Sequence, residues 1–219
     1  MNKYKLAIFD MDGTILDTLQ DLANGVNHAL KSLGMPERTV EYVRSIVGNG
    51  ILTTLTLCAP QDMTADELER LHEVFKPYYE LHRTDNTGPS AGIAELLKKL
   101  RGDGIKTAVI SNKSDDSVKA LCVEYFDGLL DLPRGLKDGV AKKPAPDSVN
   151  AVISEMGVKK EDVVYIGDSE VDVMTAKNAG IDGIFVTWGF RSREQLKENG
   201  AVVIADNTEE VYRLIVRAE

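Results

Sequence analysis

The sequence predicts an α/β fold, with a doubly wound parallel sheet and an inserted all-helical domain. From residue 91 onward, short apolar runs of strand length alternate with periodic segments of helix length. This alternation is typical of a parallel sheet that carries helices on both faces. Residues 17–83 show helical patterns alone, so they interrupt the alternation just after the first strand. The two observations together predict one sheet and one helical insertion.

Composition and charge narrow the class of protein. The chain has 219 residues, 43% of them hydrophobic, and a net charge of −9, which argues against a general nucleic-acid binder. No apolar run is long enough to span a membrane, and the first residues reach Asp10 too soon for a signal peptide. Cys58 and Cys122 lack metal-ligand spacing. We therefore expect a cytoplasmic monomer or small homo-oligomer, without nucleic-acid or membrane partners.

The first predicted strand, residues 6–9, leads directly into an acidic loop. Asp10 and Asp12 are two residues apart in extended chain, so both carboxylates can point the same way. Gly13 then permits a sharp turn. Two adjacent carboxylates need a shared proton or a divalent cation. The alternative is an ordinary acidic turn, because Asp and Gly are common turn residues.

The helical insertion contains four predicted helices. Thr64 with Glu67 forms a capping-box pattern at the start of the last one, in which Pro77 should produce a kink. The preceding three cover residues 19–33, 39–47 and 51–58.

The insertion is predicted to be a cap domain beside the site. It would comprise residues 17–83, with hinges at 16–18 and 84–90, and the α/β core would comprise residues 1–16 and 84–219. Lids of this kind exclude water and select substrates.

The remaining elements follow in helix–strand order. Helices are predicted at 93–100, 115–125, 147–156 and 170–179, and strands at 106–110, 163–166 and 183–187. A final helix–strand–helix set covers residues 192–217, and residues 127–140 give no clear pattern.

Polar residues follow two of these strands and one loop. Ser111 and Asn112 offer a hydroxyl and backbone N–H groups for phosphate oxygens, although an ordinary helix start would look the same. Lys143 precedes Pro144 in a stiff loop that could aim a cation, or could simply be a solvated basic loop.

The strand at 163–166 leads into a second acidic segment. Asp168 lies where a third carboxylate could complete a cation site, and Asp172 lies one helical turn further on. A helix N-cap at this Asp-Ser sequence is the alternative.

The order and spacing of these motifs resemble the haloacid dehalogenase superfamily. The resemblance spans essentially the whole chain, and the helical insertion lies where the helical-cap subclass carries its cap. The motifs are Asp-x-Asp-Gly-Thr, a hydroxyl residue after a middle strand, Lys-Pro, and Gly-Asp-Ser-x-x-Asp. Segments 12–18, 47–50, 111–113 and 187–190 look most like the phosphoglycolate phosphatase branch.

The resemblance implies a role for each motif residue. Asp10 would be the nucleophile that forms an aspartyl-phosphate, and the Asp12 side chain would be the general acid and base. Lys143 would neutralise charge that develops between Asp10 and the phosphate.

The resemblance also implies the binding residues. Mg²⁺ would be held by Asp10, the backbone carbonyl of Asp12, and Asp168. Asp172 would orient Lys143 or a metal-bound water. Gly13, Ser111 and the Asn112 backbone N–H belong to the phosphate-binding set. In the cap, Arg44 and Asn49 could meet a substrate carboxylate, although Arg44 also fits a solvated helix surface.

The expected activity is Mg²⁺-dependent hydrolysis of a small phosphomonoester, with phosphoglycolate as the first candidate. A sugar phosphomutase or a pyrophosphatase on the same scaffold stays open. A phospho-accepting signalling module is a further alternative, against which Asp12 and the predicted cap argue.

Overall fold

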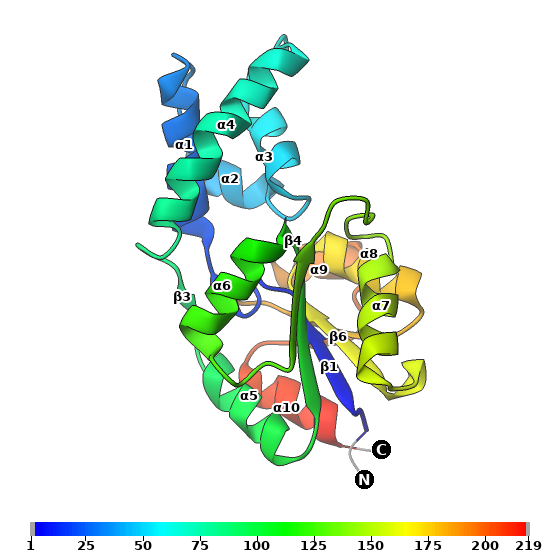
Figure 1. Cartoon of the computed structure of the whole chain (residues 1–219). Helices are drawn as coiled ribbons and strands as arrows, with labels where there is room; N and C mark the ends of the chain where they lie inside the picture. The colour runs from blue at the N-terminus through cyan, green and yellow to red at the C-terminus, as the bar shows by residue number, and fades with distance from the viewer. Residues whose placement is uncertain (1–2, 218–219) are drawn as a thin grey trace. The chain divides into compact units, whose positions relative to one another are not determined.

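The computed structural model describes residues 3–217, and the chain forms two compact units (Figure 1). Met1–Leu16 and Pro89–Glu219 make up the first unit, and Asp17–Gly88 makes up the second. Two short strands, β2 (Leu16–Asp17) and β3 (Gly88–Pro89), pair where the chain passes between the units.

The first unit is built on a parallel sheet of six strands among the described residues, in the order β5-β4-β1-β6-β7-β8. The α/β fold class predicted from the sequence is thereby confirmed. The first strand of the chain lies in the interior of the sheet, between β4 and β6. The strands are β1 (Leu6–Phe9), β4 (Lys106–Ser114), β5 (Leu132–Leu136), β6 (Val163–Gly167), β7 (Asp182–Val186) and β8 (Ile204–Ala205).

Helices cover both faces of this sheet. Side chains of a strand alternate between its two sides, and in the central strands the side chains on both sides are apolar and need to be covered. Ala7 and Phe9 of β1 pack in one hydrophobic cluster, and Leu6 and Ile8 pack in the other. The first cluster includes residues of α5 (Ile93–Gly102), α6 (Asp115–Phe126) and α10 (Thr208–Val216). The second includes residues of α7 (Asp147–Met156), α8 (Glu170–Ala179) and α9 (Arg193–Glu198).

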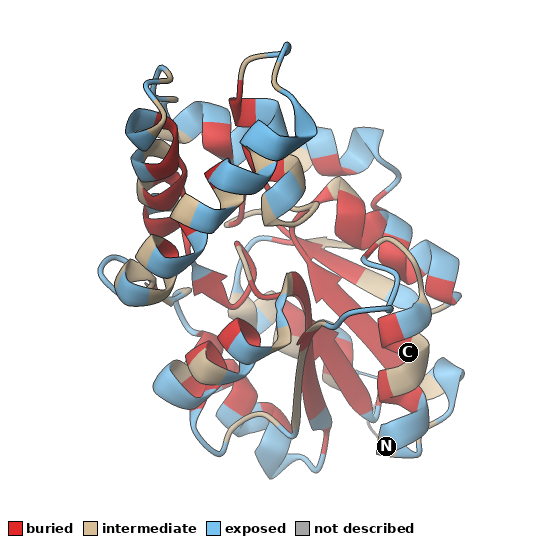
Figure 2. Cartoon of the chain, turned by 45° about the horizontal axis from the view of Figure 1, so that its top comes forward, coloured by how far each residue is buried: buried red, intermediate tan, exposed pale blue. Residues whose placement is uncertain are grey.

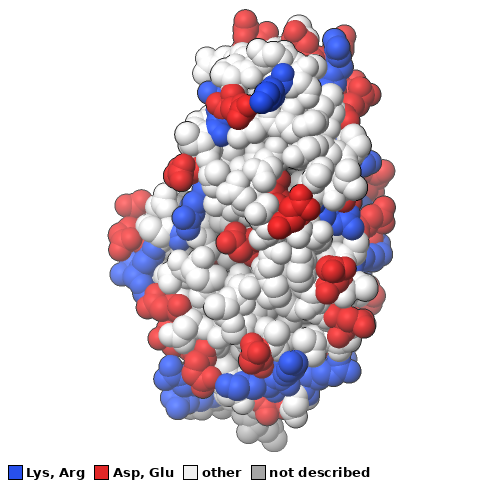
Figure 3. Space-filling view, turned by 90° about the vertical axis from the view of Figure 1, so that its left-hand side faces the viewer, with Lys and Arg blue, Asp and Glu red and all other residues white. Residues whose placement is uncertain are grey.

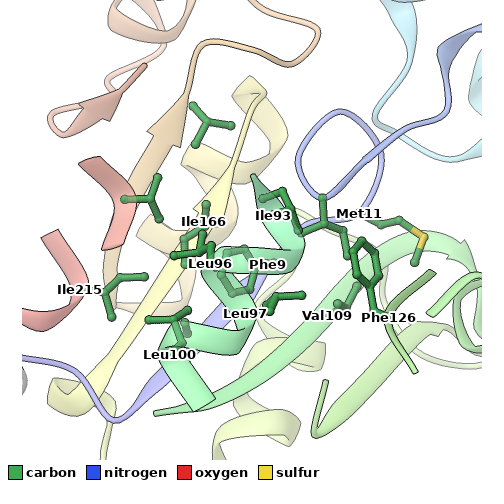
Figure 4. Close-up of a cluster of buried hydrophobic side chains, with 14 of the residues drawn as sticks. Phe9, Met11, Ile93, Leu96, Leu97, Leu100, Val109, Phe126, Ile166 and Ile215 are labelled. Carbon is green, nitrogen blue, oxygen red and sulfur yellow. The ribbon is translucent and has the colours of Figure 1, made fainter. Parts of the chain in front are cut away.

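The central strands are almost fully buried, as Figure 2 shows in red. Figure 4 shows the first cluster in detail, with Phe9 and Ile166 of the sheet beside Leu96 and Leu100 of α5. Runs of apolar residues along β1 and β6 therefore reflect burial on both faces, as expected for parallel strands.

The segment that the sequence left without a pattern, residues 127–140, contains β5. This strand lies at an edge of the sheet and pairs only with β4 within the described residues. Pro133 is tolerated there because an edge strand has one side that makes no ladder hydrogen bonds.

The second unit consists of α1 (Leu19–Ser32), α2 (Val40–Ile46), α3 (Ile51–Cys58) and α4 (Ala65–His82). The capping box of Thr64 and Glu67 is confirmed at the start of α4, and the helix runs through Pro77 as one element.

A buried carboxylate ties the start of this unit to its end. Asp21 of α1 is 2% exposed and accepts hydrogen bonds from the backbone N–H groups of Asn86 and Thr87. The Asn86 amide and the Thr87 hydroxyl donate to it as well, at 2.7 and 2.8 Å.

Two further features are the length of the helices and the distribution of charge on the surface. In the described part of the chain, no helix has the length and apolarity needed to cross a membrane. Figure 3 shows acidic and basic side chains interspersed over the face that it presents.

Candidate active site

A buried lysine lies between two carboxylates at the carboxyl end of the sheet. Asp10 directly follows β1, and the Lys143 Nζ atom donates to its Oδ1 atom at 2.6 Å. The same Nζ atom donates to Asp172 Oδ1 at 2.9 Å. The Lys143 side chain is only 3% exposed, so both ion pairs are shielded from solvent.

Tyr165 completes the surroundings of this lysine. Its hydroxyl accepts from Lys143 Nζ at 3.0 Å and donates to Asp172 Oδ1 at 3.0 Å. An ammonium group has three N–H donors, and these contacts use all three. Sequence reasoning missed Tyr165, and the only available signal was a lone hydroxyl within the apolar strand β6.

Asp172 contacts Lys143 and also caps the start of α8. The sequence had suggested these two roles as alternatives for residues 168–172. The Oδ2 atom of Asp172 accepts from the backbone N–H groups of Asp168 and Ser169 and from the Ser169 hydroxyl. It thereby forms a capping box with Ser169 at the start of α8, while its other oxygen binds Lys143. Both oxygens of Asp172 are therefore occupied by protein donors.

Asn112 holds the backbone of the lysine loop. Its Oδ1 atom accepts from the Lys143 N–H at 2.8 Å, and its Nδ2 atom donates to the Lys143 carbonyl at 3.2 Å. The peptide bond between Lys143 and Pro144 is cis. The sequence pointed to the Asn112 backbone N–H alone, so this side-chain role is an addition.

Asp168 is fixed through both of its oxygens. Thr14 Oγ1 donates to Oδ1 at 2.9 Å, and the Phe190 N–H donates to Oδ2 at 2.7 Å. A Cβ atom at Gly13 would lie 2.5 Å from Oδ2, and one at Gly189 would lie 2.3 Å from it. Glycine is required at both positions because the backbone approaches the carboxylate this closely.

The loop after β7 is braced by two long-range contacts that the sequence did not reveal. The Trp188 indole N–H donates to the Thr14 carbonyl at 3.0 Å. Arg191, buried at 6% exposure, makes a two-point contact with Glu170 through Nε at 2.7 Å and Nη2 at 3.0 Å. These contacts hold the loop whose Phe190 N–H binds Asp168.

Asp12 and Ser111 lie at the same end of the sheet. The Lys113 Nζ atom lies 3.3 Å from Asp12 Oδ1, and the side chains are 9% and 16% exposed. Ser111 is buried within β4, because the strand extends to Ser114 instead of ending at residue 110 as predicted, and its hydroxyl oxygen accepts from the Lys113 N–H at 3.1 Å. The sequence placed Lys113 in a motif without giving it a role.

The burial and mutual repulsion of the carboxylates Asp10, Asp168 and Asp172 favour a cation among them. Burial, followed by the Asp172 charge, raises the pKa of Asp10 well above its usual range, although Lys143 opposes the shift. Burial and the Asp172 charge also raise the pKa of Asp168 to about 7. Burial would also raise the pKa of Asp172, but Lys143 and the Ser169 hydroxyl outweigh it and lower that pKa.

The donor set fits a divalent metal ion. Asp10, Asp168 and Asp172 each place a carboxylate oxygen within 4.8 Å of the others. The oxygens of Asp172 already accept hydrogen bonds from Lys143, Tyr165 and the start of α8, so Asp10 and Asp168 are the better candidates for carboxylate ligands. Hard oxygen donors of this kind suit Mg²⁺.

Two of the predicted site residues belong to the helical unit. Arg44 is exposed on α2, and Asn49 is half-buried in the turn between α2 and α3. The other predicted residues all lie in the unit that contains the sheet.

The interior strand β1 is thus followed by an aspartate with a buried lysine beside it, in a parallel sheet. Residues 7–186 match the family described as haloacid dehalogenase-like hydrolase, and the chain belongs to this family.

Individual relatives cover nearly the whole chain. Phosphoglycolate phosphatase of Vibrio parahaemolyticus is 30% identical over 96% of both chains. The enzyme of the same name from Pseudomonas savastanoi pv. phaseolicola is 35% identical over 92% of this chain and 76% of its own length. A crystal structure from Lactobacillus delbrueckii subsp. bulgaricus is 42% identical, covers 98% of this chain and 99% of its own, and has a TM-score of 0.94.

Proposed function

We propose that this enzyme is a Mg²⁺-dependent phosphatase that hydrolyses a small phosphomonoester through an aspartyl-phosphate. The observation that carries the proposal is the buried contact of 2.6 Å between Lys143 Nζ and Asp10 Oδ1. The lysine orients the carboxylate and offers positive charge where a phosphoryl group would meet it.

The first half of the reaction transfers the phosphoryl group to the protein. A carboxylate oxygen of Asp10 attacks phosphorus in line, and the bond between phosphorus and the leaving oxygen breaks. The Asp12 carboxyl gives its proton to that leaving oxygen, so the alcohol departs neutral. Ser111, the backbone N–H of Asn112 and Gly13 bind the phosphoryl oxygens.

The second half returns the phosphoryl group to water. The Asp12 carboxylate takes a proton from the attacking water, whose oxygen forms the new bond to phosphorus while the bond to Asp10 breaks. Inorganic phosphate leaves, and Asp12 is protonated again for the next cycle.

Asp10, the backbone carbonyl of Asp12, and Asp168 would hold Mg²⁺. Bound there, the ion supplies charge neutralisation for the phosphoryl oxygens. Asp172 orients Lys143, because one of its oxygens accepts from Nζ and the other is fixed at the start of α8.

The proposed substrate is a phosphoglycolate-like monoester. The relatives named phosphoglycolate phosphatase support this choice. We further propose that the helical unit, predicted as residues 17–83, is a cap whose Arg44 and Asn49 contact the substrate carboxylate. The two buried free cysteines, Cys58 and Cys122, suit a reducing cytoplasm.

The test is phosphate release from 2-phosphoglycolate, pyrophosphate and hexose phosphates, with Mg²⁺ and with EDTA. We expect metal-dependent release that is highest for 2-phosphoglycolate. Asp10→Asn should lower the rate by on the order of 10³-fold or more, whereas Asp116→Asn, an exposed change of the same kind, should not. Wild-type rates in Asp10→Asn would exclude the mechanism, and release that requires a bisphosphate activator would favour a mutase.

A further inference from the structure

Lys113 is a second lysine of the site, and its surroundings differ from those of Lys143. Lys143 is fixed at 2.6 Å from Asp10 and uses its other N–H donors on Asp172 and Tyr165. Lys113 meets Asp12 at the longer distance of 3.3 Å, with its side chain 9% exposed. The contact between Lys113 and Asp12 is therefore the looser ion pair.

The position of Asp12 locates Lys113 relative to a substrate. A general acid must lie within hydrogen-bond distance of the leaving oxygen, about 3 Å. A group 3.3 Å from Asp12 Oδ1 is then within about two hydrogen-bond lengths of that oxygen. Lys113 is thus the lysine that contacts Asp12, the proposed general acid, whereas Lys143 contacts Asp10.

The charge balance shows why a second cation is useful there. Four carboxylates, Asp10, Asp12, Asp168 and Asp172, face two lysines, which leaves the site at −2 when all are ionised. One divalent cation brings this sum to zero. Without Lys113 the sum would be −1, so its charge lowers the repulsion that a substrate with a negative charge on both its phosphate and its alcohol part would meet.

We propose that Lys113 selects phosphomonoesters whose alcohol carries a carboxylate close to the ester oxygen. This inference rests on the proposed phosphatase function. In the absence of substrate Lys113 pairs with Asp12, and a substrate carboxylate accepts a hydrogen bond from its ammonium group instead. A two-carbon hydroxy acid such as glycolate is an alcohol of this kind, because one carbon atom separates its carboxylate from the ester oxygen.

The experiment compares 2-phosphoglycolate with 2-hydroxyethyl phosphate, which has the same length but a neutral alcohol group. The quantity measured is the ratio of kcat/KM for the anionic ester to that for the neutral ester. We expect wild type to favour the anionic ester, and Lys113→Met to lower the ratio at least tenfold, which corresponds to about 1.4 kcal/mol. Lys119→Met removes the same charge from an exposed ion pair of 2.7 Å with Asp115 and should keep the wild-type ratio.

The outcomes separate this inference from the function on which it rests. Equal losses on both esters would show that Lys113 acts only through Asp12 and would overturn the proposal, as would a wild type without preference. If Lys113→Met does not fold, Lys113→Gln removes the charge but keeps a polar end, and it should also lower the ratio. Absence of phosphate release from every ester in wild type would instead refute the phosphatase function itself.

Discussion

The side-chain amide of Asn112 forms a two-point contact with the backbone of Lys143, accepting from its N–H at 2.8 Å and donating to its carbonyl at 3.2 Å. The contact joins the end of β4 to the loop before α7. The amide of Asn112 in β4 therefore helps to fix the position of the Lys143 backbone. The ammonium group of Lys143 extends from this backbone toward Asp10 and Asp172.

Asn112→Ala should weaken both folding and catalysis. It leaves a buried N–H and a buried carbonyl without their partner, at a cost of about 1–3 kcal/mol in the free energy of unfolding. We expect kcat to fall by about tenfold to a hundredfold, because small displacements of a catalytic group have such effects. Asn178→Ala is the matched control, since Asn178 donates to the neighbouring Pro144 carbonyl from an exposed position. Similar losses in both variants would contradict the positioning role.

Lys143→Met should abolish activity and destabilise the fold. It leaves Asp10 and Asp172 as neighbouring buried carboxylates without their cation, which costs about 3–5 kcal/mol. Adding Asp172→Asn removes one of these charges and should recover part of the lost stability without recovering activity. Thermal unfolding and phosphate release of both variants test this, and a double variant no more stable than Lys143→Met would argue against the charge explanation.

Gly189→Ala should displace Asp168 and weaken metal binding. Its Cβ atom would lie 2.3 Å from both Cβ and Oδ2 of Asp168, so the carboxylate or the loop must move. We expect the Mg²⁺ concentration for half-maximal activity to rise about tenfold or more, if the displacement costs at least about 1.4 kcal/mol of binding energy. Gly102→Ala, in α5 with no atom within 4 Å of its added Cβ, should leave the Mg²⁺ requirement unchanged. An unchanged requirement in Gly189→Ala would contradict this prediction, because it would show that the loop moves and leaves the Asp168 carboxylate in place.

Asp21 should make the helical unit sensitive to acid. Burial opposes ionisation, but hydrogen bonds from Asn86 and Thr87 outweigh it and lower the pKa of Asp21. Because the folded pKa lies below the unfolded value of about 3.9, the stabilisation is fully present above about pH 5 and is lost as the pH falls through the folded pKa.

The corresponding variant is Asp21→Asn, which keeps the shape but faces the same donors with an amide. We expect thermal unfolding midpoints to differ from wild type at pH 7 and the difference to shrink below about pH 4. A constant difference between pH 7 and pH 3 would contradict this account.

Much of the fold could be predicted because apolar periodicity reports burial directly. The helix at 147–156 and the helix at 170–179 begin and end as predicted. The strand β5 was not predicted because it is short, half-buried and contains Pro133. All three properties fit its place at the edge of the sheet.

The candidate site was predictable only where its residues follow strands in a recognisable order. Asp10 and Asp168 each follow a buried strand, and parallel strands bring such residues to one edge. The contact of Tyr165 with Lys143 and the pairing of Arg191 with Glu170 join side chains that are 22 and 21 residues apart, and neither has a local sequence signal. Contacts of this kind depend on which strands become neighbours, which composition and periodicity do not specify.

The interior position of β1 has a consequence for the order in which the protein folds. Its neighbours β4 and β6 lie about a hundred or more residues further along the chain, and Asp10 meets Lys143 across 133 positions. On the ribosome, residues 17–88 are complete and can form their local helical contacts while β1 still lacks both neighbours. Asp10, the earliest of the site residues to be synthesised, therefore acquires its lysine only after most of the chain has been made. A truncated chain that ends before residue 143 would carry the proposed nucleophile without the lysine that contacts it.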